Sequence, residues 1–222
     1  MEQNNLPKHV AIILDGNGRW AKRFKLPRSR GHYEGGFNLA KIADHANKRG
    51  IQMLSVYAFS TENWKRPQEE IDYLMTKPLE LVNQYKERIL GANIRIRFIG
   101  RKDRLSKEML ELMEEITDDT SHHDGMVLNV CVDYGSYDDI LQAAANTKDL
   151  SLENFTNNLM IQEPVDLLIR TGGEKRLSNF LLWQSAYAEL YFTKKYWPAF
   201  KEKHFDKAIK SFSKRHRRFG GL

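Results

Sequence analysis

Cysteine is nearly absent from the sequence: among 222 residues, Cys131 is the only one. A disulfide within the chain is therefore excluded, and so is a metal site built from several thiolates. Cys131 stands inside the apolar stretch 128–132, a setting that predicts a buried and unreactive thiol.

Long hydrophobic runs are missing as well. No stretch approaches the ~18 apolar residues that a membrane-spanning helix needs, and residues 1–9 lack the apolar core of a signal peptide. We therefore expect a cytoplasmic protein, which leaves peripheral contact with a membrane surface open.

Several motifs of common enzyme classes are absent too. The sequence has no G-x-G-x-x-G fingerprint and no P-loop, so neither standard nucleotide-binding loop applies. It has no G-x-S-x-G elbow and no H-E-x-x-H pair, which argues against a serine hydrolase of the α/β type and a zinc protease.

What the chain does contain is an ample apolar fraction and a basic end. Apolar residues make up 41% of the chain, enough for a real core, and the formal net charge is +6. Ten Lys and Arg residues but only two acidic ones lie between Lys194 and Leu222. Such an end suits an anionic partner, and it is equally what a solvated helix face looks like. With no linker and no repeat, we expect one domain over residues 1–222.

Short apolar, β-branched runs alternate with helical stretches along the chain. This alternation predicts an α/β fold with a mostly parallel central sheet of about six strands flanked by helices. The expected strands are 9–14, 53–59, 94–100, 126–132, 165–170 and 189–192, and the expected helices are 35–50, 68–90 and 106–116 with Ser106 as a cap.

The long helix 68–90 contains Pro78, which predicts a kink or a division because proline removes a backbone hydrogen bond. Its broad apolar face is explained by packing in the core or, alternatively, by a place in the wall of an apolar cavity.

Polar clusters follow three of the expected strands, at 15–23, 59–67 and 170–179. In a parallel sheet these places meet at one rim, where ligands bind. Asp15 among basic residues suits Mg²⁺, which prefers one or two carboxylates completed by substrate phosphates. Glycines at such a turn let backbone N–H groups approach a phosphate, although Asp-Gly and Asn-Gly are also favoured in plain hairpins.

Arginines gather around the same rim and predict a site for two phosphorylated groups, because guanidinium groups bind phosphate bidentately. Scattered surface arginines are the competing interpretation. His32 fits phosphate binding, proton transfer or a structural role. The arginines are Arg19, Arg28, Arg30, Arg66, Arg170 and Arg176.

Taken together, the stretches 9–22, 30–35, 57–67, 166–192, 197–200 and 217–221 resemble the cis-prenyltransferases, most closely the undecaprenyl diphosphate synthases of bacteria. The resemblance covers nearly the whole chain in order and spacing. It implies condensation of isopentenyl diphosphate with an allylic diphosphate, usually farnesyl diphosphate, into a cis-polyprenyl diphosphate such as undecaprenyl diphosphate. It also implies Mg²⁺, a homodimer and an apolar tunnel for the growing chain. Trans-prenyltransferases use paired D-D-x-x-D segments, and these are absent here.

The resemblance also implies roles for individual residues. Asp15 and Asn63 are implied to be catalytic, and Asp15 and Glu189 to be associated with the metal. The other matches are implied to bind substrate: Gly16, Asn17, Gly18, Arg19, Trp20, Arg28, His32, Ser60, Thr61, Glu62, Trp64, Arg66, Arg170, Arg176 and Ser178.

Three departures from the family's pattern bear on these expectations. Residues 133–137 read DYGSY where the family commonly has NYGGR, which questions the packing of that loop and the level of activity. Lys175 replaces a frequent Gln or His, which adds a cation near the second diphosphate. The polar stretch 75–80 bears on product length.

Alternative interpretations remain at this stage. A short- or medium-chain synthase of the same family is one. A non-catalytic partner subunit is another, although such subunits typically lose the aspartate or arginine that Asp15 and Arg19 retain here. A nucleic-acid-binding protein would explain the basic end but not the Asp15 loop, so we expect no nucleic-acid partner.

Overall fold

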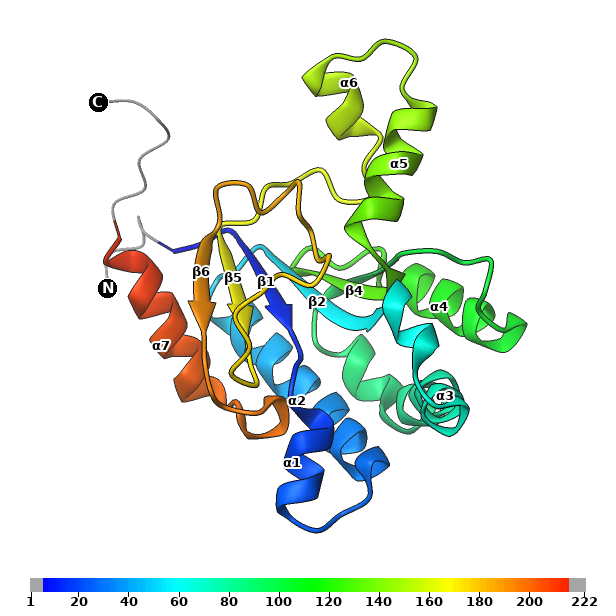
Figure 1. Cartoon of the computed structure of the whole chain (residues 1–222), viewed down its shortest axis with the longest axis vertical. Coiled ribbons are helices and arrows are strands. Elements are labelled where there is room, and N and C mark those ends of the chain that lie inside the picture. Colours follow the sequence, from blue (N-terminus) through cyan, green and yellow to red (C-terminus); the bar gives the residue numbers. More distant parts are fainter. Residues whose placement is uncertain (1–5, 216–222) are drawn as a thin grey trace.

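Six parallel strands form the centre of the molecule (Figure 1). The structure, a computed structural model, describes residues 6–215, except for the side chains of residues 78, 79, 81–86, 88 and 89. The strands lie in the order β3-β4-β2-β1-β5-β6, so consecutive strands are joined by crossovers. Their bounds are β1 His9–Ile13, β2 Met53–Ser60, β3 Arg95–Ile99, β4 Val127–Tyr134, β5 Leu167–Arg170 and β6 Glu189–Phe192. The six predicted strands are thus confirmed, and the pairing is parallel throughout.

Helices cover the sheet and connect its strands. Ser106 caps α4 as predicted, because its hydroxyl accepts a hydrogen bond from the Met109 amide at 3.2 Å. The helices are α1 Asn17–Arg23, α2 Arg28–Lys48, α3 Gln68–Leu90, α4 Lys107–Thr120, α5 Ser136–Asn146, α6 Leu152–Asn157 and α7 Glu202–Ser213, with 3₁₀ turns η2 Thr61–Lys65 and η3 Trp197–Ala199.

Helix α2 begins seven residues before the predicted start. Pro27 precedes it in an extended conformation and provides a natural helix entry. The glycines in its first two turns allow α1 to pack closely. A Cβ at Gly31 would lie only 2.1 Å from the carbonyl oxygen of Asn17.

Helix α3 is not divided at Pro78; it runs unbroken from Gln68 to Leu90. The side chain of Pro78 lies outside the described residues, as does the terminal RRFGG motif at 217–221. Within residues 6–215, no helix combines the length and the apolar character that crossing a bilayer requires.

Two apolar cores lie on the two faces of the sheet. The larger joins residues of α2, α4 and α7 to the strands, with Trp197 and Phe200 fully buried in it. The smaller is built from the strands, residues 161–165 and Phe180 and Leu181. Cys131 belongs to the smaller core and is fully buried, and this burial raises the pKa of its thiol. The prediction of an unreactive buried thiol agrees with this placement.

Candidate active site

Asp15 lies just beyond the carboxyl end of β1 and contacts two guanidinium groups. Its Oδ1 accepts a hydrogen bond from Arg19 at 2.8 Å, and its Oδ2 accepts one from Arg170 at 3.1 Å. The Asp15 side chain keeps 25% exposure, whereas that of Arg170 keeps 5%. Arg19 stands on α1 and Arg170 ends β5, so two segments far apart in the sequence meet at one carboxylate that solvent reaches.

The turn that presents Asp15 needs an unusual backbone. Gly16, which directly precedes α1, has a φ of +107°, a conformation that other residues adopt only under strain. The backbone oxygen of Asp15 accepts hydrogen bonds from the Thr171 hydroxyl at 2.7 Å and the Trp197 amide at 3.1 Å. The loop is therefore fixed from two sides before any ligand arrives.

The loop after β5 folds back onto Arg170. The Nη1 of this residue donates to the Ser178 hydroxyl at 2.7 Å and to the backbone oxygen of Arg176 at 2.5 Å. Ser178 has a φ of +51°, so this contact holds a residue in the left-handed region. The Arg170 Nε is buried without a protein partner, and Arg176 reaches Glu174 at 2.6 Å.

A second cluster forms where α2 and α3 begin. One oxygen of Glu70 lies 3.0 Å from Arg28 Nε, 2.8 Å from Arg66 Nη1 and 3.2 Å from His32 Nε2. Burial lowers the pKa of His32, although Glu70 acts in the opposite direction. Arg28 also borders the Asp15 loop, since a Cβ at Gly18 would lie 3.0 Å from its Nε.

The predicted substrate loop 60–66 is held by hydrogen bonds rather than left free. Asn63 Oδ1 accepts from the Ser60 amide at 3.1 Å, and Glu62 accepts from Asn179 at 2.9 Å. Partial burial acts to raise the pKa of Glu62, but the hydrogen bond from Asn179 and others from its own loop leave that pKa lowered. Thr61 lies close to Gly135, whose Cβ would meet its hydroxyl at 2.6 Å.

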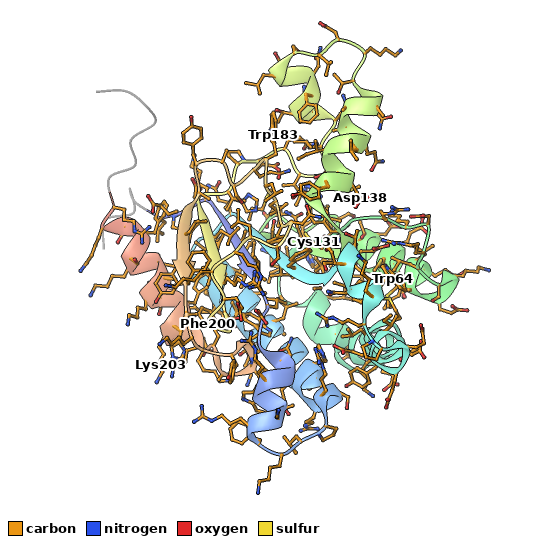
Figure 2. All side chains as sticks on the ribbon, in the orientation of Figure 1. Trp64, Cys131, Asp138, Trp183, Phe200 and Lys203 are labelled. Carbon is orange, nitrogen blue, oxygen red and sulfur yellow. The ribbon has the colours of Figure 1, made fainter. Side chains whose placement is uncertain are left out.

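Trp64 connects this loop to the strand β4. Its Nε1 donates to Asp133 at 2.8 Å, and Asp133 is fully buried. Arg104 contacts both oxygens of the same carboxylate, at 2.9 and 2.5 Å, and lies 5.4 Å from the Trp64 ring. Figure 2 shows Trp64 beside the first turns of α3.

The DYGSY departure is accommodated by the packing. Ser136 stands where the family commonly has its second glycine; its side chain is buried and accepts from the Leu182 amide at 2.8 Å. Tyr137 stands at the missing arginine and is exposed, and Lys175 is exposed as well.

A cavity of about 630 Å³ lies beside the Asp15 loop. Asn17 and His32 line it near the rim, and most of its remaining wall is apolar and comes from α2, α3, α4 and the strands β2 to β4. The Asn17 Oδ1 is buried without a partner. The described apolar residues of α3 that face this cavity are Tyr73, Leu74 and Met75.

Within one chain, Glu189 does not come close to Asp15. It opens β6 and pairs with Leu167, at the level of Val10 on β1. At ~3.3 Å per residue, the end of β1 is at least ~10 Å further along the sheet. Glu189 forms an ion pair with Arg215 instead. No group of three His, Cys, Asp or Glu side chains that could hold a metal occurs among the residues that the structure describes.

Most predicted residues therefore gather at one rim, in two clusters and the adjoining loop. Trp20 contributes an aromatic contact with Phe24 at 4.9 Å between ring centres. Sequence reasoning missed Glu70, Asp133, Arg104 and Thr171. Only Glu70 carried a local signal, because it stands four residues after Arg66 on what becomes the α3 entry.

Comparison with known proteins agrees with this geometry. The family model described as "Putative undecaprenyl diphosphate synthase" matches residues 13–220. An isoprenyl transferase of Bacillus cereus is 44% identical over all of this chain and 91% of its own length. One of Aquifex pyrophilus is 46% identical over 97% of this chain and 96% of its own.

Two solved structures share the fold. A lavandulyl diphosphate synthase from Lavandula x intermedia, in complex with dimethylallyl diphosphate, has a TM-score of 0.92 and 32% identity, covering 99% of this chain and all of that one. A probable undecaprenyl diphosphate synthase from Campylobacter jejuni has a TM-score of 0.81 and 36% identity with the same coverage. The chain belongs to the undecaprenyl diphosphate synthase family of cis-prenyltransferases, and it is an enzyme of that class.

Proposed function

We propose that this enzyme, as a single catalytic domain, joins isopentenyl diphosphate to an allylic diphosphate, with farnesyl diphosphate as the starter, and lengthens the product in cis steps. The observation that carries the proposal is Asp15, an accessible carboxylate held between Arg19 and Arg170 at the rim beside an apolar cavity. A charged head group and a long apolar tail need these two environments next to each other.

The two arginine clusters suit two head groups. The allylic diphosphate would lie on the Gly16–Arg19 turn with Arg28, His32 and Arg66 around it, so that its tail enters the cavity that His32 lines. Isopentenyl diphosphate would lie on Arg170, Arg176 and Ser178, where the buried Nε of Arg170 still lacks an acceptor. Ser60, Thr61, Glu62, Asn63 and Trp64 would close over the reacting ends from the loop between β2 and α3.

A magnesium ion fits the donor set at Asp15. One carboxylate in contact with solvent suits Mg²⁺ when diphosphate oxygens complete the coordination. When bound, the ion would supply positive charge that stabilises the departing diphosphate. Glu189 would join this site only from a position that a single chain does not provide.

The chain's own residues would then do the rest of the chemistry. The alkene of isopentenyl diphosphate forms a bond to C1 of the allylic substrate, the allylic C–O bond breaks and a proton leaves. Arg19, Arg28 and Arg170 would stabilise charge on the diphosphates, and holding both substrates in line would supply much of the remaining rate. The released diphosphate is itself a candidate acceptor for the proton.

Product length has two candidates. The descriptions of the family model and of the Campylobacter jejuni structure support a long product such as undecaprenyl diphosphate, with the cavity serving as the tunnel for the chain. The high structural likeness to a lavandulyl diphosphate synthase favours a shorter product as the second candidate.

The test is direct. Purified protein with Mg²⁺, farnesyl diphosphate and labelled isopentenyl diphosphate is expected to make a polyprenyl diphosphate, and chromatography of the dephosphorylated lipids gives its length. Asp15→Ala should abolish product while the far-UV spectrum stays unchanged. Absence of product with farnesyl, geranyl and dimethylallyl starters would contradict the proposal.

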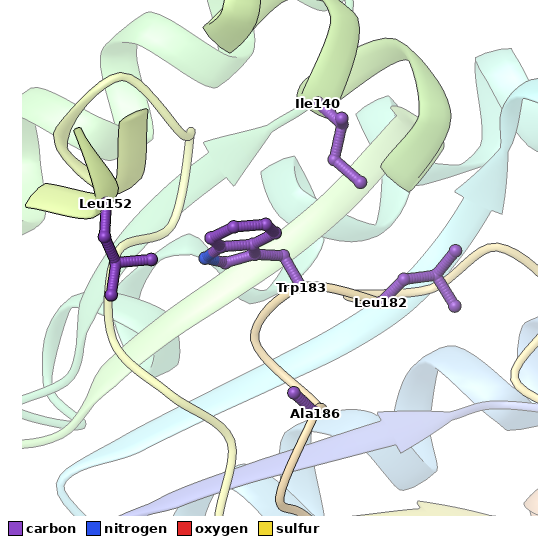
Figure 3. Close-up of a pocket in the computed structure, with 5 residues that line it drawn as sticks. All are labelled: Ile140, Leu152, Leu182, Trp183 and Ala186. Carbon is purple, nitrogen blue, oxygen red and sulfur yellow. The ribbon is translucent and has the colours of Figure 1, made fainter. Parts of the chain in front are cut away.

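We also propose a homodimer that buries the apolar surface around α5 and α6, which project from the body of the molecule in Figure 1. Leu141, Leu152 and Tyr187 are 70%, 73% and 66% exposed. Trp183 stands in a hollow of about 440 Å³, lined by Ile140, Leu152, Leu182, Trp183 and Ala186 (Figure 3). Clustered exposure of this kind marks a protein interface. Light scattering should give twice the chain mass, and Leu141→Glu should reduce it.

Peripheral contact with anionic lipid is supported by one face of α7. Phe205, Ile209 and Phe212 are buried, whereas Lys203, Lys207, Lys210 and Lys214 are exposed. Binding to vesicles should require phosphatidylglycerol and weaken with salt. Equal binding to phosphatidylcholine vesicles would contradict it.

A further inference from the structure

Glu70 is unusual among the charged groups near the cavity because one of its oxygens serves three donors. Arg28 Nε, Arg66 Nη1 and His32 Nε2 lie 3.0, 2.8 and 3.2 Å from its Oε1. The Glu70 side chain is only 9% exposed, so water replaces little of this contact. Arg28 and His32 come from the first turns of α2, and Arg66 stands two residues before α3 begins.

The charges at this cluster do not balance. Two guanidinium groups face one carboxylate, and burial lowers the pKa of His32, which favours its neutral form. A positive charge therefore remains. An anion with more charge than a single carboxylate, such as a diphosphate, matches the donors better than Glu70 does.

Glu70 also stands where replacement of its contacts by a diphosphate would affect both the cavity and the Asp15 turn. It lies in the first turn of α3, and Tyr73 and Leu74 of the next turn line the cavity. His32 lines the same cavity, and Arg28 approaches Gly18 of the Asp15 turn. A ligand that drew Arg28 and His32 away from Glu70 would loosen the hold of α2 on the start of α3.

We propose that Glu70 is a positioning residue that acts as an internal counter-ion: it holds Arg28, Arg66 and His32 together without substrate and competes with the allylic diphosphate for them. This inference rests on the proposed function, which places that diphosphate at the same three side chains. Glu70 then sets the affinity for the head group and joins its arrival to the position of α3.

The probe is inorganic pyrophosphate with Mg²⁺, measured by titration calorimetry at constant ionic strength. Glu70→Gln keeps an oxygen of the same reach and removes the competing charge, so its Kd for pyrophosphate should fall about three- to tenfold. Glu69→Gln is the matched control: it is exposed, stands on the same helical turn and removes the same charge. Its Kd should stay within about twofold.

A purely structural role predicts the opposite sign, because loss of the ion pairs would only disorder the donors. Unchanged or weaker pyrophosphate binding in Glu70→Gln would overturn the inference while leaving the proposed function in place. No pyrophosphate binding by the unaltered protein would overturn both.

Kinetics and melting give independent readouts. In Glu70→Gln the KM for the allylic substrate should fall and the KM for isopentenyl diphosphate should stay. Without ligand, the melting temperature of Glu70→Gln should be lower than that of the unaltered protein. Added pyrophosphate should raise the melting temperature of the variant by more than it raises that of the unaltered protein. If Glu70→Gln does not fold, Glu70→Asp, which withdraws the carboxylate by one methylene, should shift the pyrophosphate Kd in the same direction by less. An unchanged or higher Kd there contradicts the inference as well.

Discussion

Two aspartates stand at the same rim of the sheet and have opposite surroundings. Asp15 follows β1, keeps 25% exposure and is shared by Arg19 and Arg170. Asp133 lies in β4, is fully buried and is held by Arg104 and by the Trp64 indole. Both are carboxylates in contact with guanidinium groups, so the type of contact does not distinguish them.

Access to solvent does distinguish them. Both oxygens of Asp133 are committed to protein donors in a place that no ligand reaches, which suits an anchor for the loop 61–65. Asp15 can exchange its contact with Arg19 for a cation at little cost, since exposed ion pairs contribute only ~0–1 kcal/mol. The carboxylate that can bind a ligand is therefore the one that solvent reaches, Asp15, and not the buried one, Asp133.

The largest expected effect breaks this contrast at Asp15. Asp15→Asn keeps the size and one oxygen acceptor for the arginines but removes the charge that a magnesium ion needs. We expect kcat/KM to fall by at least about 10³-fold, or about 4 kcal/mol. The free energy of unfolding should fall by up to about 3 kcal/mol, because Arg19 is exposed whereas the nearly buried Arg170 loses its counter-charge.

Product formation and urea unfolding measure the two quantities on one preparation. A variant that keeps a tenth of the activity, or loses activity only through unfolding, would contradict the assignment of Asp15 as the reacting carboxylate.

The second effect belongs to Asp133. Asp133→Ala leaves the Trp64 N–H and Arg104 without their acceptor and puts alanine at a φ of +50°. We expect about 2–4 kcal/mol less free energy of unfolding, with a smaller loss of activity per folded molecule than at Asp15.

Asp133→Asn is the matched control, because asparagine tolerates the left-handed conformation and keeps one acceptor. It should cost less than the alanine variant in the same urea titration. Equal costs would mean that the remaining oxygen and the left-handed backbone contribute nothing, and that loss of the carboxylate charge accounts for the whole effect.

How far the sequence alone leads depends on how local the signal is. The strands were predicted correctly because an apolar run is a local feature of the sequence. The proximity of Asp15, Arg170 and Ser178 was predicted because parallel strands end at one rim of the sheet. The contacts of Glu70 with Arg28 and His32, and the Asp133–Arg104 pair, were missed because packing brings these residues together across 29 or more positions of the chain. Register explains the rest: Glu189 matches a family motif, yet its pairing with Leu167 places it at the other end of the sheet.

The start of α2 is a second place where a tertiary contact, and not a local pattern, determines the structure. The predicted helix began at residue 35 and left out Gly31, a residue type that weakens an isolated helix. Gly31 is needed inside the helix because α1 crosses it at backbone distance, which no local pattern reveals.

A smaller effect is expected at Trp64, whose indole connects the loop 61–65 to the buried Asp133. Trp64→Phe keeps the ring and its contact with Phe59, at 5.2 Å between centres, but removes the hydrogen bond to Asp133. We expect a loss of about 1 kcal/mol in stability and a roughly three- to tenfold lower kcat/KM, since the loop over the substrates loses one anchor. Trp20→Phe, the same substitution at a tryptophan whose ring packs against Phe24, is the control and should leave stability within about 0.5 kcal/mol. An unchanged stability in Trp64→Phe would show that the indole does not anchor the loop.

The smallest effect extends the contrast between buried and accessible groups to histidine. His9 is 2% exposed, with Nε2 2.7 Å from the Ser55 hydroxyl. Burial lowers its pKa, although the backbone oxygens of Glu163 and Pro164 act to raise it. The unfolded chain therefore takes up the proton first as the pH falls below about 6.5, so the free energy of unfolding should decrease from there down to the lower pKa of the folded state. His32 and His204, whose pKa values are also lowered by burial, add to the same pH dependence of the free energy of unfolding.

His9→Gln should flatten the slope of the free energy of unfolding in urea against pH between about 7 and 5. The KM for either diphosphate should not change, because His9 lies at the amino end of β1, away from the rim. A slope that His9→Gln leaves intact would assign the whole pH dependence to the other histidines, and pyrophosphate, which would favour protonated His32, should then reduce it.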